Sequence, residues 1–208
     1  SCSLVGSGDV YKRQDLYIVS RYSGVVMICV GLMCLFPLLI DLIYFEFNYA
    51  CFIIPGVFSV ILGYICMKAL DKYSNSKMRL KHGMMISSIA WMWASVIGGV
   101  VISLATGTDF LNGIFESTSA LTGTGITMFD NVEILPHSIL YFRAFEQWVG
   151  GLGVVVMMIG ILTRPGTASA KLYQSEAREE RLTPSVKTTL KKTIEIYLIY
   201  TIIGIILY

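Results

Sequence analysis

Residues Thr108–Phe129 read TDFLNGIFESTSALTGTGITMF, and the arrangement of the whole chain follows from this segment. A helix capped by Thr108 or Asp109 would continue to about Leu121. At about 12 residues it would rise only ~18 Å, too short for a bilayer core of about 30 Å. Both flanking segments are long and apolar. We therefore predict a re-entrant helix that returns as extended backbone to the side it came from.

Long runs without charge place the rest of the chain in a membrane. The 208 residues are 55% hydrophobic and 14% charged, against roughly 25% charged in a soluble domain. Charge-free runs cover Tyr22–Ile40, Phe47–Met67 and His82–Thr108, with 19, 21 and 27 residues. A membrane helix needs about 20 mostly apolar residues. This composition predicts an all-α integral membrane protein whose partner is the lipid bilayer, and it excludes a soluble enzyme, a disordered chain and a nucleic-acid binder.

The apolar runs divide the chain into five spans. They are expected at about Tyr22–Tyr44, Ala50–Met67, Gly83–Ala105 and Ser138–Leu162, with a fifth beginning near Thr193. The resulting domains are two leading transmembrane helices (15–72), one span–pore helix–span unit (83–163), a cytoplasmic linker (164–192) and the truncated first span of a second unit (193–208). Residues 1–14 show no apolar periodicity and are expected to be a non-native or disordered leader. The chain is expected to be a fragment, ragged at both ends.

The basic residues define the sides of the membrane. If the first four spans alternate in direction, fifteen of the sixteen Lys and Arg fall on one side, and the exception is Arg143. Such residues collect in cytoplasmic loops. The opposite loops carry acids, among them Glu46 and Asp109. This pattern predicts a multi-pass protein of the cell inner membrane, with a cytoplasmic N-terminus and with 106–137 outside.

The return segment has the composition of a cation filter. Gly123 and Gly125 alternate with Thr122 and Thr124, and glycine allows φ values that are barred to other residues. Successive carbonyl oxygens can then replace the hydration shell of a cation, and K⁺ suits such a site better than Mg²⁺ or Ca²⁺. The alternative, an amphipathic surface helix with a glycine-rich turn, stays open on these residues alone.

Several polar residues are candidates to support this segment from behind. Glu116 precedes it by one or two turns, and it could either hydrogen-bond the return backbone or face outer water. Arg143 shares a helix face with Glu146 and Gln147, and polar groups inside a membrane rarely face lipid. Small residues permit close helix packing, and three of them could pack against the short helix: Gly150, Gly151 and Gly153.

Three longer motifs resemble the Trk/Ktr potassium uptake family, whose membrane subunits are TrkH and KtrB. They are FESTSALTGTGIT (115–127), LPHSILYFRAFEQWVGGLGVVVM (135–157) and RLTPSVKTTLKKTIEIYLIY (181–200). The resemblance implies four units of span, pore helix and span around one pore, preceded in the TrkH type by two extra spans. It implies K⁺ as the transported ion, bound by backbone carbonyls of Thr122, Gly123, Thr124 and Gly125, with Gly125 as the filter glycine.

The same resemblance extends to partners. It implies a homodimer of the full-length protein and a cytoplasmic nucleotide-binding regulatory subunit of the TrkA/KtrA type, with no bound cofactor. First units of the family often read Thr-Thr-Thr-Gly, so Gly123 is a departure that loosens the strand.

Two other functions remain as alternatives. One is a membrane-embedded enzyme near the outer surface, which would use Glu116, Asp130, Glu133 or His137, although no catalytic motif accompanies them. The other is a non-transporting assembly or sensor subunit. We expect the transporter, and hence no enzymatic activity and no catalytic residue.

Overall fold

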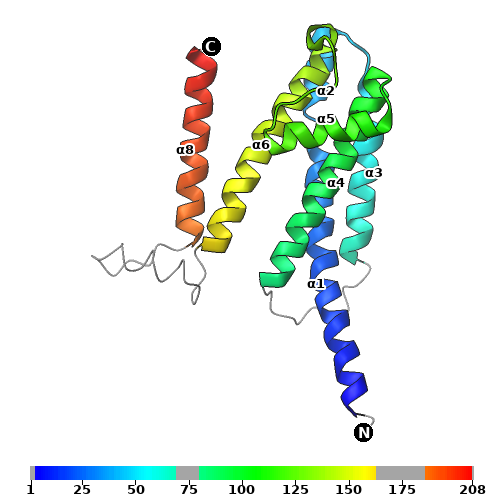
Figure 1. Ribbon diagram of the computed structural model, residues 1–208, viewed down its shortest axis with the longest axis vertical. Helices are drawn as coiled ribbons and strands as arrows, with labels where there is room; N and C mark the ends of the chain where they lie inside the picture. The colour runs from blue at the N-terminus through cyan, green and yellow to red at the C-terminus, as the bar shows by residue number, and fades with distance from the viewer. Residues whose placement is uncertain (1–2, 69–79, 163–185, 208) are drawn as a thin grey trace, which may run out of the picture. The chain divides into compact units, whose positions relative to one another are not determined.

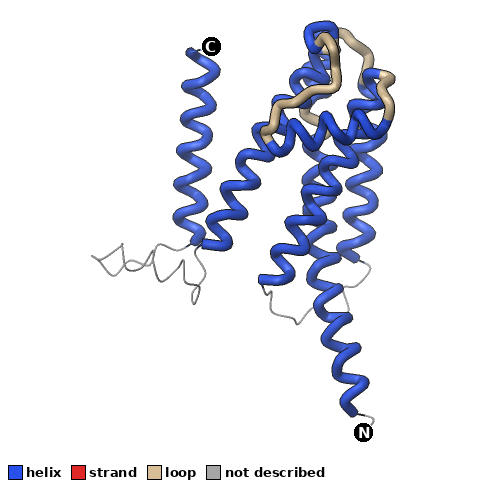
Figure 2. Tube along the Cα trace, viewed as in Figure 1, coloured by secondary structure: helices blue, strands red, loops and turns tan. Residues whose placement is uncertain are grey.

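The computed structural model describes residues 3–68, 80–162 and 186–207 (Figures 1 and 2). Within these ranges the regular structure is helical, which confirms the all-α class. The elements are α1 (Ser3–Met33), α2 (Pro37–Tyr44), α3 (Tyr49–Lys68), α4 (Leu80–Thr106), α5 (Phe110–Thr122), the 3₁₀ turn η2 (Val132–Ile134), α6 (His137–Leu162) and α8 (Val186–Leu207). The chain forms two compact units, 1–147 and 148–208, which are described separately.

Three helical segments of the first unit are long and apolar enough to cross a membrane. They are Asp15–Tyr44, Tyr49–Lys68 and Lys81–Thr106 among the described residues. Figure 1 shows α1, α3 and α4 running side by side, with α5 lying across them near one end. The prediction of a multi-pass membrane protein is thereby confirmed.

Glycines let α1 and α3 approach closely. A Cβ atom added at Gly24 would lie 2.6 Å from the carbonyl oxygen of Gly63, and one added at Gly31 would lie 2.6 Å from that of Gly56. Small residues at a helix interface bring backbones together where no hydrophobic force acts between helices in lipid. Ser59 adds a bond from its Oγ to the Met27 carbonyl at 2.7 Å. The two leading helices therefore pack as one hairpin.

The segment of the first expected span, Tyr22–Tyr44, contains a helix break. Helix α1 ends at Met33, and α2 begins at Pro37. Proline has no N–H group and its ring clashes with the preceding turn, whereas the first turn of a helix tolerates it. The break therefore precedes Pro37, and the proline starts the next helix.

The first helix also begins earlier than the expected leader allows. Residues 3–14 continue the helix of α1, whereas segment 1–14 was expected to be disordered or non-native. Extending an existing helix costs far less than starting one, so the long apolar part of α1 propagates helix towards Ser3. That residues 1–14 are non-native stays a prediction.

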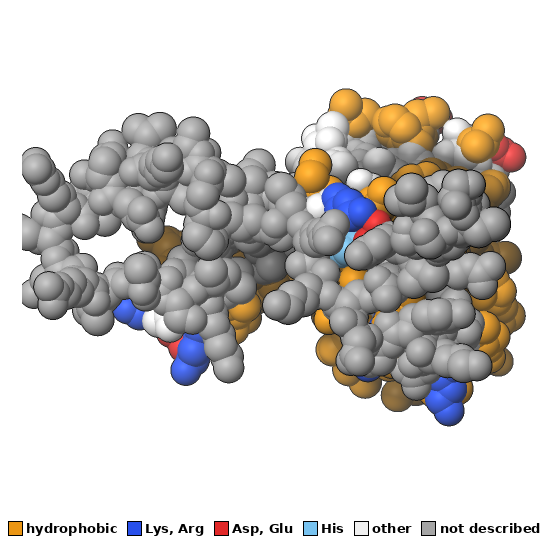
Figure 3. Space-filling model, turned by 90° about the horizontal axis from the view of Figure 1, so that it is seen from below, with side chains coloured by type: hydrophobic (Ala, Val, Ile, Leu, Met, Phe, Trp, Pro, Cys, Tyr) orange, Lys and Arg blue, Asp and Glu red, His pale blue; other side chains and the backbone are white. Residues whose placement is uncertain are grey.

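One end of the first unit carries an ion cluster that joins α1 to α4. The Asp15 carboxylate contacts Lys81 and lies 2.7 Å from His82 Nε2. The His82 side chain is 1% exposed. Figure 3 looks at this end and shows basic, acidic and histidine side chains together. The cluster fixes the start of α4 against α1.

The second unit consists of the later part of α6 and of α8. The Trp148 indole donates to Thr201 Oγ1 at 3.0 Å, and the Tyr197 hydroxyl donates to the Trp148 carbonyl at 3.0 Å. Helix α8 runs unbroken from Val186, so it includes the end of the expected linker 164–192. Residues 163–185 of that linker lie outside the described residues.

Candidate functional site

Helix α5 has the predicted position and length. Asp109 is its N-cap, and the Oδ2 atom of Asp109 accepts from the Leu111 N–H at 3.3 Å. The helix runs over 13 residues, Phe110–Thr122, and ends at Gly123, whose φ is 71°. A left-handed residue is a common helix terminator and is usually glycine. The positive φ at the end of α5 thus favours glycine at position 123.

Helix α5 lies against α4 at backbone contact. A Cβ atom added at Gly113 would lie 2.5 Å from the Gly99 carbonyl oxygen, and one at Gly99 would lie 2.7 Å from the Ile114 nitrogen. A Cβ at Gly98 would collide with the side chains of Ser117 and Glu146. The close packing seen in this unit is thus made by glycines that the sequence analysis did not select.

The return segment is folded back onto the end of α5. The Ser119 carbonyl accepts from the N–H groups of Thr124, at 3.0 Å, and Gly125, at 3.5 Å. The Ser119 hydroxyl donates to the Ile126 carbonyl at 2.6 Å. Gly125 has φ 74°, which L side chains rarely adopt. Ser119 therefore fixes both ends of the segment Thr124–Ile126.

Glu116 contacts the next part of the return segment. Its Oε1 accepts from Thr127 Oγ1 at 2.8 Å and from the Met128 N–H. Its Oε2 lies 2.7 Å from Arg143 of α6, and Glu116 is 1% exposed. Of the two alternatives left open, the structure therefore has Glu116 bonded behind the return backbone and not facing water.

A second contact joins α5 to α6 one residue further on. Ser117 Oγ donates to Glu146 Oε1 at 2.7 Å, and both residues are buried. Arg143 and Glu146 thus both face α5. Gln147 is exposed and lies outside this network, because one residue turns a helix by about 100°.

The three glycines expected against the short helix occupy different surroundings. Gly150 is buried, and a Cβ atom added at Gly153 would meet open space. A Cβ atom added at Gly151 would lie 2.9 Å from the Tyr197 hydroxyl oxygen. These residues belong to the second unit and α5 to the first, so their packing against α5 stays a prediction.

The arrangement leaves one side of the return segment open. Residues 122–126 are all exposed, while Glu116, Ser117 and Ser119 behind them are buried. The described residues contain no group of three or more His, Cys, Asp or Glu that could hold a metal ion. Any cation here would therefore meet backbone carbonyls and hydroxyls and not a carboxylate cluster.

The family model of TrkH, described as a cation transport protein, matches residues 52–208. The chain belongs to the TrkH family. The match includes α5, the return segment and α6, so the geometry described above is that of a TrkH-family chain.

The chain is similar to several cation and potassium transport proteins and to solved structures. An uncharacterized cation transporter of Methanocaldococcus jannaschii is 39% identical, over 94% of this chain and 41% of that protein. The Trk system potassium uptake protein TrkG of Escherichia coli is 30% identical, over 90% and 39%. The crystal structure of the potassium transporter TrkH from Vibrio parahaemolyticus matches with a TM-score of 0.72 and 26% identity, over 88% of this chain and 36% of that chain.

The chain thus spans about two fifths of the length of these relatives. The residues that sequence reasoning missed are the serines and glycines of the α4–α5–α6 contact. Ser117 and Ser119 could have been recognised because they closely follow Glu116 on a short helix, and polar side chains inside a membrane rarely face lipid.

Proposed function

We propose that this chain supplies one filter strand of a K⁺ uptake pathway, as the pore-forming subunit of a Trk-type transporter. The strand is Thr122–Gly125, with K⁺ bound by backbone carbonyls. Four such strands are needed around one pore. The chain covers about 40% of the relatives named as potassium uptake proteins, and the rest of their length leaves room for the other three strands.

One observation carries this proposal. Among the described residues, no hydrogen-bond donor reaches the carbonyl oxygens of Gly123, Thr124 or Gly125, whereas the next one, that of Ile126, accepts from Ser119. Backbone carbonyls at membrane depth need a partner. Non-helical backbone is tolerated at this depth only where it is buried in protein or lines a water-filled path. A dehydrated cation has the right charge to be the partner of these carbonyl oxygens.

The surroundings favour a monovalent cation. Helix α5 ends at the strand and brings roughly half a negative charge to it. The Thr122 and Thr124 hydroxyls lie 2.7 Å apart on the exposed side. Glu116 is already neutralised by Arg143, so no carboxylate favours a divalent ion.

The proposal extends to the domains, the location and the partners of the full-length transporter. The proposed domains are 15–72, 83–163, 164–192 and 193–208. We also propose an inner-membrane location with a cytoplasmic N-terminus, because the basic residues fall on one side of the membrane. A homodimer and a nucleotide-binding regulatory subunit are proposed from the family resemblance alone. Glu116, Arg143, Gly150 and Gly151 are proposed as filter-supporting residues, whereas Gln147 is exposed and lies outside the bonds to α5.

The test is to replace Gly125 with valine in the full-length transporter that contains this segment. A β-branched residue resists φ 74°, so we expect K⁺ uptake to be lost or its preference over Na⁺ to disappear. The matched control is Gly107→Val, because Gly107 has φ 71° and equally open surroundings but lies between α4 and α5. Unchanged K⁺ uptake and selectivity in Gly125→Val would contradict the filter assignment.

The same experiment separates the alternatives. A non-transporting assembly or sensor subunit would show no flux to lose. A membrane-embedded enzyme would depend instead on Glu116, Asp130, Glu133 or His137. Of these, Glu116 is buried in its bonds to Thr127, Met128 and Arg143.

A further inference from the structure

The N-terminus of α6 has no capping residue of its own. Helices leave their first N–H groups without intrahelical partners, and the residue before α6 is Pro136, whose side chain cannot accept a hydrogen bond. The Pro136 carbonyl accepts from Ile139 and Leu140, both at 3.0 Å. The N–H groups of His137 and Ser138 remain to be satisfied.

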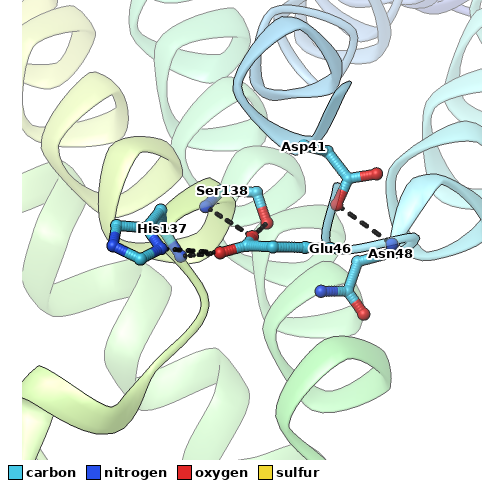
Figure 4. A network of polar contacts seen from close by, with 5 residues as sticks. All are labelled: Asp41, Glu46, Asn48, His137 and Ser138. Carbon is cyan, nitrogen blue, oxygen red and sulfur yellow. Dashed lines mark hydrogen bonds and ion pairs between the residues drawn. The ribbon is translucent and has the colours of Figure 1, made fainter. Parts of the chain in front are cut away.

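A glutamate 91 residues earlier in the chain satisfies both. Glu46 Oε1 accepts from the His137 N–H at 2.5 Å and lies 2.8 Å from His137 Nδ1. Glu46 Oε2 accepts from the Ser138 N–H at 3.0 Å and from Ser138 Oγ at 2.6 Å. Figure 4 shows the carboxylate between the two residues. A negative charge at a helix N-terminus is also favoured by the helix dipole.

The loop that carries Glu46 is itself held in an unusual conformation. Phe45 and Phe47, on either side of it, have φ 53° and 57°, values that cost a residue with a side chain of the order of 1 kcal/mol or more. Asp41 binds this loop from α2: its carbonyl accepts from the Glu46 N–H at 3.1 Å, and its Oδ1 accepts from the Asn48 N–H at 3.0 Å (Figure 4). Strained backbone that is held by specific bonds commonly marks a functional position.

We propose that Glu46 is a positioning residue for the filter strand, acting through α6. Arg143 lies six residues after His137, about 9 Å along the helix axis, and Glu146 follows one turn later. By fixing the depth and rotation of the first turns of α6, Glu46 sets where Arg143 meets Glu116 and where Glu146 meets Ser117. The inference rests on the proposed function.

The placement of Glu46 suits a permanent role. It lies between α2 and α3, so the leading helices supply this contact to α6. Tyr44, from the same loop region, stacks on the His137 ring with centroids 4.1 Å apart. Burial acts to raise the pKa of Glu46, but hydrogen bonds from Ser138 and His137 outweigh it and lower the pKa to about 2. The carboxylate is thus ionised at any physiological outer pH.

The experiment measures the K⁺ over Na⁺ transport ratio of the full-length transporter with Glu46→Gln. Glutamine keeps the shape but loses the charge and one acceptor. We expect the ratio to fall about threefold to tenfold, which corresponds to about 0.7 to 1.4 kcal/mol and is less than the full contribution of one hydrogen bond to a charged group. A purely structural role would lower the amount of folded protein and leave the ratio unchanged. The matched control is Glu133→Gln, an exposed acid of the same outer loops.

A milder variant keeps the proposal testable if Glu46→Gln does not fold. Ser138→Ala removes one hydroxyl bond and should lower the ratio in the same direction by a smaller factor. In combination with Glu46→Gln its effect should be less than additive, because both remove the same bond. If both variants fold with the wild-type ratio, or if neither folds, the positioning role is rejected.

The outcome is distinguishable from failure of the proposed function. That failure appears as a wild-type ratio in Gly125→Val. An altered ratio in Gly125→Val together with a wild-type ratio in folded Glu46→Gln overturns the role of Glu46 alone.

Discussion

Glycines serve opposite purposes in two adjacent regions of the first unit. Where α4 meets α5, Gly99 and Gly113 have ordinary helical backbone but no room for a side chain. In the return segment, Gly123 and Gly125 have room on every side but a backbone conformation that disfavours side chains. The first pair is needed by the packing of the helices and the second by the path of the chain.

The difference distinguishes the scaffold from the candidate site. The α4–α5 contact is held by touching backbones and tolerates no added volume. The return segment is held from behind by hydrogen bonds from or to Glu116 and Ser119, and its other side is open. An open side next to constrained backbone is where a further unit or an ion can enter. The predictions below test this division by adding volume, by changing backbone preference and by removing charge.

The largest effect is expected for Gly113→Leu. The new side chain would meet the Gly99 carbonyl and the Ser103 hydroxyl, and backbone cannot move aside as a flexible side chain can. Overpacking of this kind costs about 3 kcal/mol at the upper end of its usual range. The check is the unfolding temperature of the detergent-solubilised protein. The control is Gly83→Leu, which lies in α4, the helix that α5 packs against, but has no neighbour within 4 Å of an added Cβ atom. It should keep the wild-type value.

A smaller effect is expected when only the backbone preference changes. Gly123→Ala places a side chain at φ 71° in open space, which costs about 1 kcal/mol of unfolding free energy. Gly123→Asn should cost less, because asparagine tolerates the left-handed conformation. Denaturant unfolding of the two variants checks the order. Equal losses would mean that space and not φ limits this position.

A third effect is expected from pH at Glu46. Since its pKa lies below the ordinary value of 4.5, at about 2, the ionised form stabilises the fold fully above pH 4.5. This contribution is lost progressively as the pH falls from about 4.5 towards 2. The unfolding temperature of the wild type should therefore exceed that of Glu46→Gln by a constant margin down to about pH 5, and the margin should then narrow. A margin that widens at low pH would contradict this sign.

The sequence predicted the local parts of the fold well. The cap at Asp109, the short helix, the glycine-rich return and the start of the next span near Ser138 all follow from residues close in sequence. Such features depend on propensity and periodicity, which a single chain displays. The break before Pro37 is also local, since the proline stands late in the expected first span even though the apolar run continues through it.

Contacts between distant residues could not be predicted in this way. Nothing in the local pattern around Glu46 indicates that its partners are His137 and Ser138. The pairing of Ser117 with Glu146 and the contact of Gly99 with Gly113 depend equally on how helices pack. Three-dimensional proximity decides these interactions, and many arrangements of the same helices would leave the sequence pattern unchanged.

The long separation between Glu46 and its partners also bears on how the protein is made. A ribosome adds about 5–20 residues per second, so His137 and Ser138, 91 and 92 residues later in the chain, are synthesised roughly 5–18 s after Glu46. During that interval the hairpin of α1 and α3 can insert and pack through its glycines. The first turn of α6 is thus made after the carboxylate that binds it, and its docking onto Glu46 can follow the packing of the earlier helices.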